Sequence, residues 1–150
     1  MDLLMLKIYP EKLVKHWGML RAFIEKTLPP TADPEARANA ILDSLLTGRM
    51  DAFQFVDMTD EANIMKGFVI LAVVSSVDGY GRDLLIYSAY SYQAETLGKE
   101  ALLEAWNLMV KYAQSKSCAA ITAYTNIDHM INLAAGFGAE TSYRYIRKEV

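Results

Sequence analysis

The residues best suited to hold an anion stand together where a long helix is predicted to begin. The stretch Gln93-Ala94-Glu95-Thr96-Leu97-Gly98-Lys99-Glu100 combines a glycine and a lysine with the backbone N–H groups of a helix start. Such N–H groups have no acceptor within the helix, and the helix dipole adds partial positive charge, so phosphate groups bind there. Glu95 and Glu100 oppose an anion, although an acidic residue in the first turn also stabilises the helix itself. Gly98 and Lys99 therefore indicate either a phosphate site or a plain solvent-exposed helix start.

Other residues that could carry catalysis or bind a metal are few. His16 and His129 are the only histidines and Cys118 is the only cysteine, which excludes an internal disulfide and makes a metal site improbable. No Ser-His-Asp order is present for nucleophilic catalysis. We expect His16 to face solvent on a charged helix. His129 stands beside Asp128 at a helix start, and a catalytic role for it is the less favoured interpretation. The catalytic residues therefore stay unknown.

Two further groups of side chains each have two interpretations. Tyr87, Tyr90 and Tyr92 could line a groove for an acceptor substrate, but aromatic residues are common in strands and core packing is favoured. A small basic cluster near the C-terminus is expected on a solvated strand edge, with a protein or nucleic-acid contact as the alternative; it contains Arg144, Arg147 and Lys148.

Apolar periodicity predicts the elements that position these residues. We expect strands at residues 3–8, 51–58, 67–77, 83–92, 118–125 and 142–150, and helices from Glu11 to Pro29-Pro30, from Asp33-Pro34 to Gly48, over 96–117 and over 129–135. Asp78-Gly79-Tyr80-Gly81 predicts a hairpin turn, and Asp128 a helix cap before a helix closed by Gly136. Strands on both sides of long helices indicate an α/β domain of three layers, with a mixed central sheet flanked by helices.

The third predicted helix connects two strands that should lie parallel. Its beginning then sits beside the end of the strand that finishes at Tyr92, which places the anion-binding stretch at the edge of the sheet. We expect the large apolar residues of these elements to be mostly buried: Trp17, Phe68, Ile70, Leu102, Trp106, Ile121 and Phe137.

Composition limits the class of protein. The 150 residues suit a single domain spanning 1–150, and 53% hydrophobic residues can build a sizeable core. The net charge of -3 lacks the basic excess of a general nucleic-acid binder, so a nucleic-acid partner is disfavoured. The longest apolar run, from Phe68 to Val74, is far shorter than the ~20 residues of a membrane helix. We read the first residues as structure and expect a cytoplasmic protein without a membrane partner.

The order of elements, together with the C-terminal sequence, resembles the GNAT acetyltransferase superfamily over nearly the whole chain. In that family an Asn after the fifth strand precedes a helix, a Gly-Phe pair and a closing strand. The corresponding stretch here runs from Thr125-Asn126 through His129-Met130-Ile131-Asn132-Leu133-Ala134-Ala135-Gly136-Phe137 to Tyr143 and Lys148. A narrower similarity is to small GNAT-like proteins of phages and prophages, and it rests on Tyr9-Pro10-Glu11, Trp17 and Leu45-Leu46-Thr47-Gly48-Arg49-Met50. That narrower similarity implies a location in the host cytoplasm or the virion.

The resemblance implies acetyl-CoA as cofactor and an amine as acceptor. The family's loop would place the cofactor against Gln93, Ala94, Thr96, Gly98 and Lys99, with Asn126 beside the pantetheine arm or, equally, serving as a loop or capping residue. Two features depart from the family. The loop lacks the usual pair of small residues, and Asn132 stands where many members carry a tyrosine that protonates the leaving thiolate. The sequence therefore supports an N-acetyltransferase with a degraded pyrophosphate loop. The alternative is a catalytically silent module for structure, assembly or binding, with a protein partner or a second copy of itself.

Overall fold

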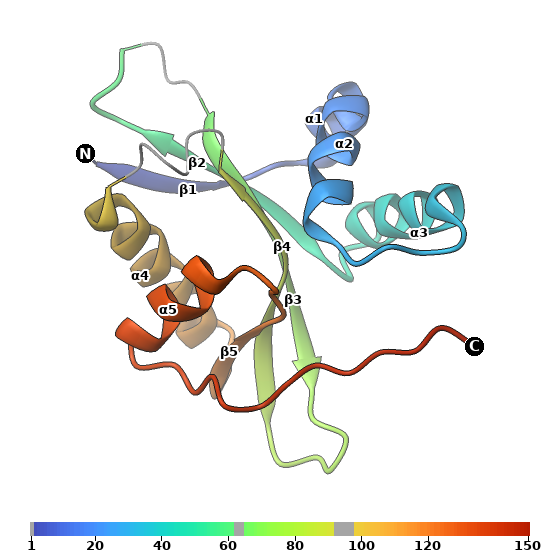
Figure 1. Ribbon diagram of the computed structural model, residues 1–150. Helices are drawn as coiled ribbons and strands as arrows, with labels where there is room; N and C mark the ends of the chain where they lie inside the picture. Colours follow the sequence, from blue (N-terminus) through green and yellow to red (C-terminus); the bar gives the residue numbers. More distant parts are fainter. Residues whose placement is uncertain (1, 62–64, 92–97) are drawn as a thin grey trace.

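The computed structural model describes residues 2–61, 65–91 and 98–150, and its centre is a five-stranded mixed sheet (Figure 1). The strands lie side by side in chain order: β1 (Leu3–Lys7), β2 (Asp51–Asp57), β3 (Met65–Ser75), β4 (Arg82–Ser91) and β5 (Ala120–Ala123). The first four are antiparallel neighbours, whereas β4 and β5 are parallel. This parallel pair confirms the predicted crossover through the long helix.

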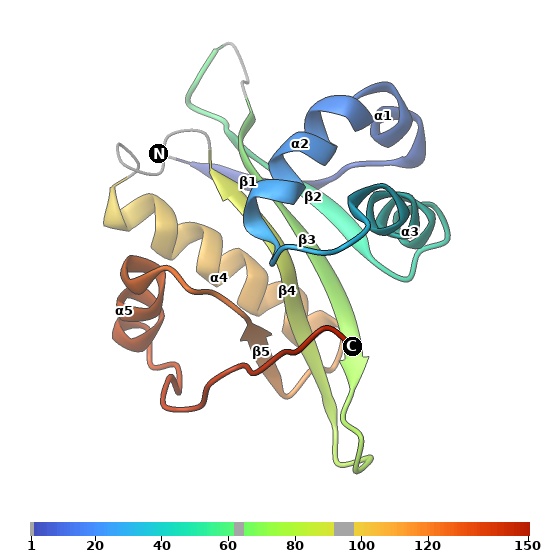
Figure 2. The same cartoon turned by 45° about the vertical axis from the view of Figure 1, so that its right-hand side comes forward.

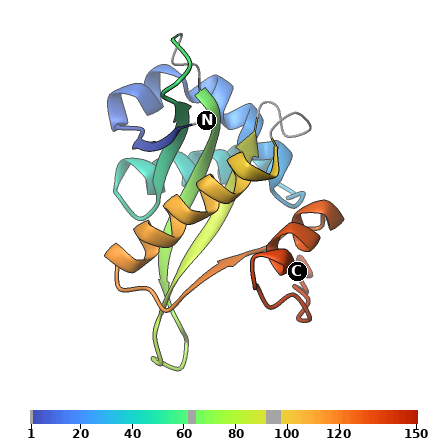
Figure 3. The ribbon, with the colours of Figure 1, turned by 90° about the vertical axis from the view of Figure 1, so that its left-hand side faces the viewer.

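Helices cover both faces of the sheet. One layer contains α1 (Pro10–Lys15), α2 (Trp17–Thr27) and α3 (Pro34–Leu46), and α4 (Lys99–Ser115) crosses the opposite face (Figures 1 and 3). The short α5 (Asp128–Gly136) follows β5 and lies on the α4 side (Figure 2). The predicted three-layer α/β architecture is therefore confirmed.

Alternate residues of β3 fill the two halves of the core. Phe68 and Ile70 pack into the layer of α1, α2 and α3, whereas Val69 and Leu71 pack beneath α4. All four side chains are 1% exposed. A strand buried on both faces is what the nearly continuous apolar run of this segment predicted.

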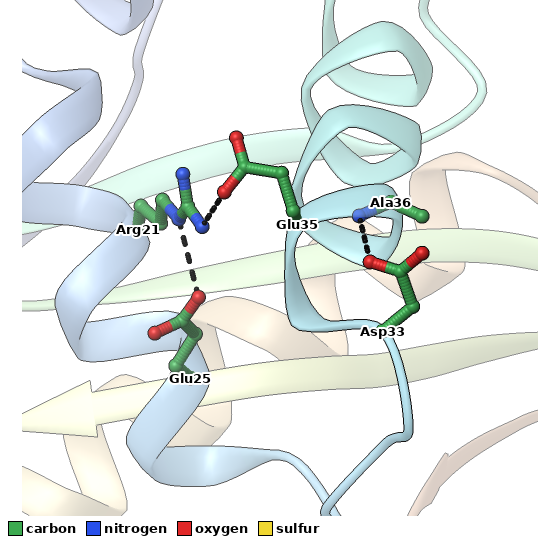
Figure 4. A network of polar contacts seen from close by, with 5 residues as sticks. All are labelled: Arg21, Glu25, Asp33, Glu35 and Ala36. Atoms are coloured by element: carbon green, nitrogen blue, oxygen red, sulfur yellow. Dashed lines mark hydrogen bonds and ion pairs between the residues drawn. The ribbon is translucent and has the colours of Figure 1, made fainter.

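The residues that the sequence predicted as turns and helix ends have those roles in the structure. The Asp33 carboxylate accepts a hydrogen bond from the Ala36 N–H at 3.0 Å and caps α3, as Figure 4 shows. Gly48, just beyond α3, has a φ of 79°, and Gly79 in the β3–β4 hairpin has a φ of 74°. Both angles lie in the left-handed region that glycine adopts without the steric cost of a Cβ.

The first predicted helix is divided into two. The chain turns at His16, with φ -110° and ψ 16°, so α1 and α2 run in different directions. The turn still lets the apolar side of each piece face the sheet, because Leu13, Leu20 and Ile24 are all buried. The apolar spacing alone did not reveal this break.

The predicted strand at 142–150 is wrong. These residues form no regular element, and each one is exposed. Tyr143 and Tyr145 alternate, but Ile146 interrupts the alternation and is 90% exposed. Alternation makes a strand only where a partner edge supplies hydrogen bonds, and no strand among the described residues pairs with this segment.

Several boundaries near the C-terminal half also differ from the prediction. The described part of the long helix begins at Lys99, and its predicted first residues fall outside the described ranges. The cap position of α5 is Ile127, so Asp128 is the first helical residue and the predicted cap is wrong. Gly136 belongs to the helix, and the left-handed residue that follows is Gly138, with a φ of 90°.

Only part of the predicted core is fully buried. Phe68 and Ile70 are, whereas Trp17, Leu102, Trp106, Ile121 and Phe137 are half-buried. On α4 the stripe that meets the sheet is rotated relative to the prediction and contains Ala101, Met109 and Ala113. Trp106 lies at the border of that stripe, where its ring is 5.8 Å from the ring of Phe137.

Candidate functional site

The two parallel strands, β4 and β5, pair over only part of the length of β4. The ladder between β4 and β5 ends at the pair Ile86 and Ala123, while β4 continues to Ser91. We call the part of β4 beyond Ile86, which β5 does not pair with, the open edge. An unpaired strand edge presents backbone N–H and C=O groups to any extended ligand that lies along it.

A bulge lies at the start of this open edge. The register of β3 and β4 pairs Leu71 with Ile86 and Ile70 with Ser88, so Tyr87 is an extra residue. Bulges leave the ladder locally unpaired and re-aim the neighbouring side chains. Tyr87 and Ser88 consequently both face the layer of α1, α2 and α3.

The re-aimed Ser88 is tied to helix α2. Ser88 is 3% exposed, and its hydroxyl oxygen is 2.5 Å from that of Thr27 at the end of α2. The Thr27 hydroxyl also donates to the Ile24 carbonyl at 2.9 Å, which uses its one proton. Ser88 is therefore the donor to Thr27. This contact fixes the position of the bulge against the helix.

The far end of the open edge carries a buried hydroxyl. Ser91 pairs across the sheet with Gly67 and stands on the α4 side of β4, as does Ala89. Ala89 is exposed, so the strand is open to solvent at that position. The Ser91 hydroxyl is buried and has no hydrogen-bond partner. A buried hydroxyl without a partner costs free energy unless a ligand or water satisfies it.

The described start of α4 has the features of an anion site. Gly98 is the cap residue, and its carbonyl accepts from the N–H groups of Ala101 at 3.1 Å and Leu102 at 3.4 Å. Gly98 and Lys99 are both exposed. No atom lies within 4 Å of where a Cβ on Gly98 would stand, so a ligand can approach this backbone closely. Of the other predicted contacts, Gln93, Ala94 and Thr96 lie outside the described residues, as does Glu95.

Asn126 lies in the loop that leads from β5 into α5. It is exposed and is not the cap residue of α5, so of the loop and capping roles that the sequence left open, it has the loop role. The loop is held instead by Thr125, whose hydroxyl accepts from the Ile127 N–H at 3.2 Å. A threonine two residues before a helix start is a local turn signal that the sequence analysis did not use. The contact between Asn126 and a cofactor stays a prediction.

The tyrosines of β4 pack as the core interpretation predicted. Tyr90 stacks on Phe23 of α2 with ring centres 4.3 Å apart, and Tyr87 packs in the same layer. Burial raises the pKa of the Tyr87 hydroxyl, and the nearby Arg37 charge partly offsets this. Tyr92 lies outside the described residues. Both described tyrosines lie on the face opposite α4, so they flank the open edge from the other side.

The remaining polar candidates lie elsewhere and are exposed. His16 lines a surface hollow of about 140 Å³ with Lys12 and Gln54, and His129 is exposed on α5. In the C-terminal basic cluster, Arg144 donates to the Thr141 carbonyl at 3.0 Å and Arg147 is 3.9 Å from Glu149. Nowhere in residues 2–61, 65–91 and 98–150 do three or more His, Cys, Asp or Glu side chains gather as metal ligands would. In those same ranges no helix is long and apolar enough to span a membrane.

A charged network on the outside of the helical layer has a structural role. The Arg21 guanidinium donates to Glu25 at 3.1 Å and to Glu35 at 2.7 Å, which joins α2 to α3 (Figure 4). The hydrogen bond to Arg21 lowers the pKa of the Glu35 carboxyl and raises that of the guanidinium. The carboxylates of Glu25 and Glu35 are therefore both paired with Arg21, and this network leaves none of the three charged groups free for a ligand.

The whole fold can be compared with solved structures. It is similar to a ribosomal-protein-alanine N-acetyltransferase from Brucella melitensis biovar Abortus, with a TM-score of 0.69, 12% identity and 100% of both chains covered. It is also similar to a "predicted acetyltransferase with acetyl-CoA" from Clostridium acetobutylicum, with a TM-score of 0.68, 11% identity and coverage of 98% of this chain and 96% of that one. A GNAT family acetyltransferase of Staphylococcus aureus matches with a TM-score of 0.67, 9% identity and 100% of both chains.

This chain has the GNAT fold. The TM-scores of 0.67–0.69 establish the architecture, in agreement with the sequence resemblance, whereas identities of 9–12% leave the activity to be argued from the site. No protein-family model and no curated protein matches the sequence. Within the GNAT fold, the open edge of β4 and the start of α4 are the features of this chain that bear on function.

Proposed function

We propose that the chain is an N-acetyltransferase that takes the acetyl group from acetyl-CoA and transfers it to an amine. The observation that carries this proposal is that the pairing of β4 with β5 ends at Ile86, while β4 continues toward the segment that leads into α4. The pantetheine arm of coenzyme A is an extended chain with two amides, which suits pairing with a free strand edge. Its pyrophosphate suits the positive end of a helix.

The residues around this edge fit such a ligand. The buried Ser91 hydroxyl lacks a partner on the side from which the ligand would approach, and the strand is open to solvent at the exposed Ala89. Gly98 gives access to backbone N–H groups, and Lys99 supplies a positive charge beside them. Gln93, Ala94 and Thr96 would complete the pyrophosphate loop, and Asn126 would contact the pantetheine arm from the β5 side. Glu95 and Glu100 weaken the loop by their charge.

The chain's own groups would assist the transfer in two ways. When bound, acetyl-CoA supplies a thioester carbonyl that an amine can attack. Outward-facing N–H groups of the β4 edge beside the bulge at Tyr87 would donate to the oxygen that becomes negative during this attack. Tyr124 lies just beyond β5 and is 62% exposed. Its hydroxyl would supply a proton to the departing sulfur. Asn132, in the usual position of that tyrosine, cannot.

Titration with acetyl-CoA in a calorimeter tests the proposal. We expect saturable binding below about 1 mM, the affinity of a weak but specific site. Gly98→Ala is the matched variant, because its φ of -63° suits alanine and nothing in the protein obstructs the added Cβ. It should leave the unfolding midpoint unchanged and weaken binding. If neither coenzyme A nor acetyl-CoA binds at millimolar concentration, the proposal fails.

The acidic residue in the loop provides a second, smaller test. Glu95→Gln removes a negative charge beside the proposed pyrophosphate position, and a charge at an exposed helix end is worth about 0.3–1 kcal/mol. Affinity for coenzyme A should therefore rise roughly two- to fivefold, and more at low salt than at high salt. Glu104→Gln, within α4 and more than one turn beyond its described start at Lys99, is the control and should change the affinity less.

A catalytically silent module is the second candidate function. Two features favour this candidate: Asn132 stands in place of the tyrosine that donates a proton, and Glu95 and Glu100 put negative charge beside the pyrophosphate loop. A chain that does not turn over acetyl-CoA would tolerate both. Such a module, including one carried by a phage or prophage, would act through a protein partner or through a second copy. Binding of acetyl-CoA without acetylation of any amine in a broad panel of small amines and peptide N-termini would support this candidate.

A further inference from the structure

We propose that the surface hollow between α1, α2, β2 and the start of β3 binds a free carboxylate with an apolar body, a molecule of about the size of benzoate. This hollow has a volume of about 140 Å³. The proposal does not depend on the acetyltransferase assignment. It rests on the size of the hollow, on the apolar side chains within it and on the charge of the polar groups that border it.

Much of the lining of the hollow is apolar. Ile8 and Leu20 line it and are 4% and 3% exposed, and the side chains of Met19 and Met65 complete the apolar part. Methionine is flexible and adapts to ligands of irregular shape. An apolar cavity of about 150 Å³ holds a benzene ring. A hollow of about 140 Å³ therefore suits one aromatic ring or a short branched chain.

The junction of α1 and α2 brings two basic side chains to this hollow. The His16 N–H donates to the Lys12 carbonyl at 3.0 Å, and the Leu20 N–H donates to the His16 carbonyl at 3.0 Å. The spacing of four residues per step therefore continues through the break at His16. Residues four apart in a helix lie on the same side, and these three residues accordingly all line the hollow.

The polar groups of the lining suit an anion. Lys12 carries a positive charge, and His16 and Gln54 can donate hydrogen bonds, whereas the described residues that line the hollow include no acidic side chain. Within residues 2–61, 65–91 and 98–150, none of these three side chains makes a hydrogen bond or an ion pair. A carboxylate pairs with an ammonium group and accepts from N–H donors. A carboxylate on an apolar body is the ligand that uses both parts of the lining.

The hollow is separate from the open edge of β4. Gln54 on β2 pairs with Phe68 on β3, and Phe68 pairs with Tyr90 on β4. Gln54 is therefore two strands from β4, about 10 Å at the usual strand spacing. The rings of Phe68 and Tyr90 pack with that of Phe23 from α2 in the intervening part of the layer. A ligand in the hollow would thus leave the open edge free and would join α1 and α2 to β2.

An NMR titration of the full chain with sodium benzoate tests the proposal. We expect saturable binding with a dissociation constant of about 0.1–1 mM, as suits so small a ligand. The ring signal of His16 and the amide signals of Leu20 and Gln54 should shift together, while the ring signal of His129, the other histidine, should not. Benzamide has the ring without the charge, and acetate has the charge without the ring, so both should bind several-fold more weakly. Equal shifts at His129, equal affinity for benzamide, or no saturation by about 10 mM would overturn the proposal.

Two lysines of α1 provide a matched pair of variants. Lys12→Gln removes the charge that borders the hollow, and Lys15→Gln removes the same charge from the same helix at a position outside the lining. The first should weaken benzoate binding about two- to fivefold, the range of an exposed ion pair, and the second should change it less. Both side chains are exposed, so both variants should keep the unfolding midpoint of the parent. An equal loss in the two variants would mean a general attraction of anions to α1 and would contradict a specific site.

A peptide that ends in phenylalanine offers the same ring and carboxylate from a protein partner. Benzoate should bind more tightly than this peptide, because the peptide backbone adds bulk that a hollow of this size does not hold. Tighter binding of the peptide, with shifts of the same His16, Leu20 and Gln54 signals, would overturn the assignment to a free small carboxylate.

Discussion

The first three-quarters of the chain and the last quarter are built differently. Every side chain that the described residues bury almost completely belongs to the part from Leu3 to Ala113. Beyond Cys118, β5 is half-buried, α5 contains no buried residue, and residues 142–150 are exposed throughout. The first part therefore contains the fully buried core, while the second carries the exposed Tyr124 and Asn126, which we propose to act at the candidate site. A single domain can divide these tasks because loops and edges tolerate exposure that a core does not.

A pair of aromatic deletions should show this contrast most strongly. Phe68→Ala removes a ring that is 1% exposed, and we expect a loss of about 3–5 kcal/mol in the free energy of unfolding. Phe137→Ala, in the half-buried contact with Trp106, should cost well under half as much. Urea denaturation of both variants measures the difference. Equal losses would show that the last quarter is packed as tightly as the first part.

Gly67→Ala should destabilise the first part of the chain where β3 packs against the end of β4 beside the candidate site. A Cβ at this position would stand 2.5 Å from the Tyr90 carbonyl oxygen, a backbone atom that cannot turn aside. The two strands must therefore separate, at a cost of about 1–3 kcal/mol. Gly98→Ala is the control with open space around it. A shift in the unfolding midpoint for Gly67→Ala alone is the expected result, and equal midpoints would contradict it.

Ser88→Ala should weaken the link between α2 and the bulge. The variant removes the donor to Thr27, and loss of one buried hydrogen bond costs about 0.5–1.5 kcal/mol. Amide exchange should speed up in β4 around Tyr87 more than in β2. Ser88→Thr retains the hydroxyl and should restore slow exchange. Unchanged exchange at Tyr87 in Ser88→Ala would mean that the bulge is held by the strands alone.

The smallest expected effect concerns alkaline pH. Burial, with the nearby Asp51 charge, raises the pKa of Tyr112 to about 12, above the usual ~10 of a free tyrosine. Between these values the unfolded chain loses the proton while the folded chain keeps it, so stability falls as pH rises. Tyr112→Phe should flatten that fall. Thermal unfolding from pH 9 to 12 tests this, with exposed Tyr80→Phe as the control.

The sequence predicted local signals and the order of elements well. Asp33, Gly48 and Gly79 act through their own backbone and nearest neighbours, so their types alone were sufficient. The parallel pair β4–β5 followed from one strong helix between two apolar segments. Trp106, by contrast, faces Phe137 more than the sheet, because the helix is rotated by contacts that periodicity does not reveal. Trp106→Ala should therefore cost less than the ~3–5 kcal/mol of a fully buried ring.

The candidate site was predictable only where it is local. Gly98 and Lys99 do begin the described part of α4, as a glycine before a helical pattern suggests. The bulge at Tyr87 and the partnerless hydroxyl of Ser91 depend on how β3 and β5 end beside β4, and no residue type within β4 marks them. The strand expected at 142–150 shows the same limit, since a strand needs an edge to join.

The chain order of the sheet has a consequence for synthesis. Because the strands lie side by side in the order in which they are translated, each new strand meets its neighbour already formed. Ala113 is the last fully buried residue of the core, so the ribosome releases every fully buried residue of the described chain before it has released β5 and α5. Domains fold as such units emerge during translation. The nascent protein would thus be stable before it is functional, and a ribosome that stalls after α4 would leave a folded product without Tyr124 and Asn126 at its candidate site.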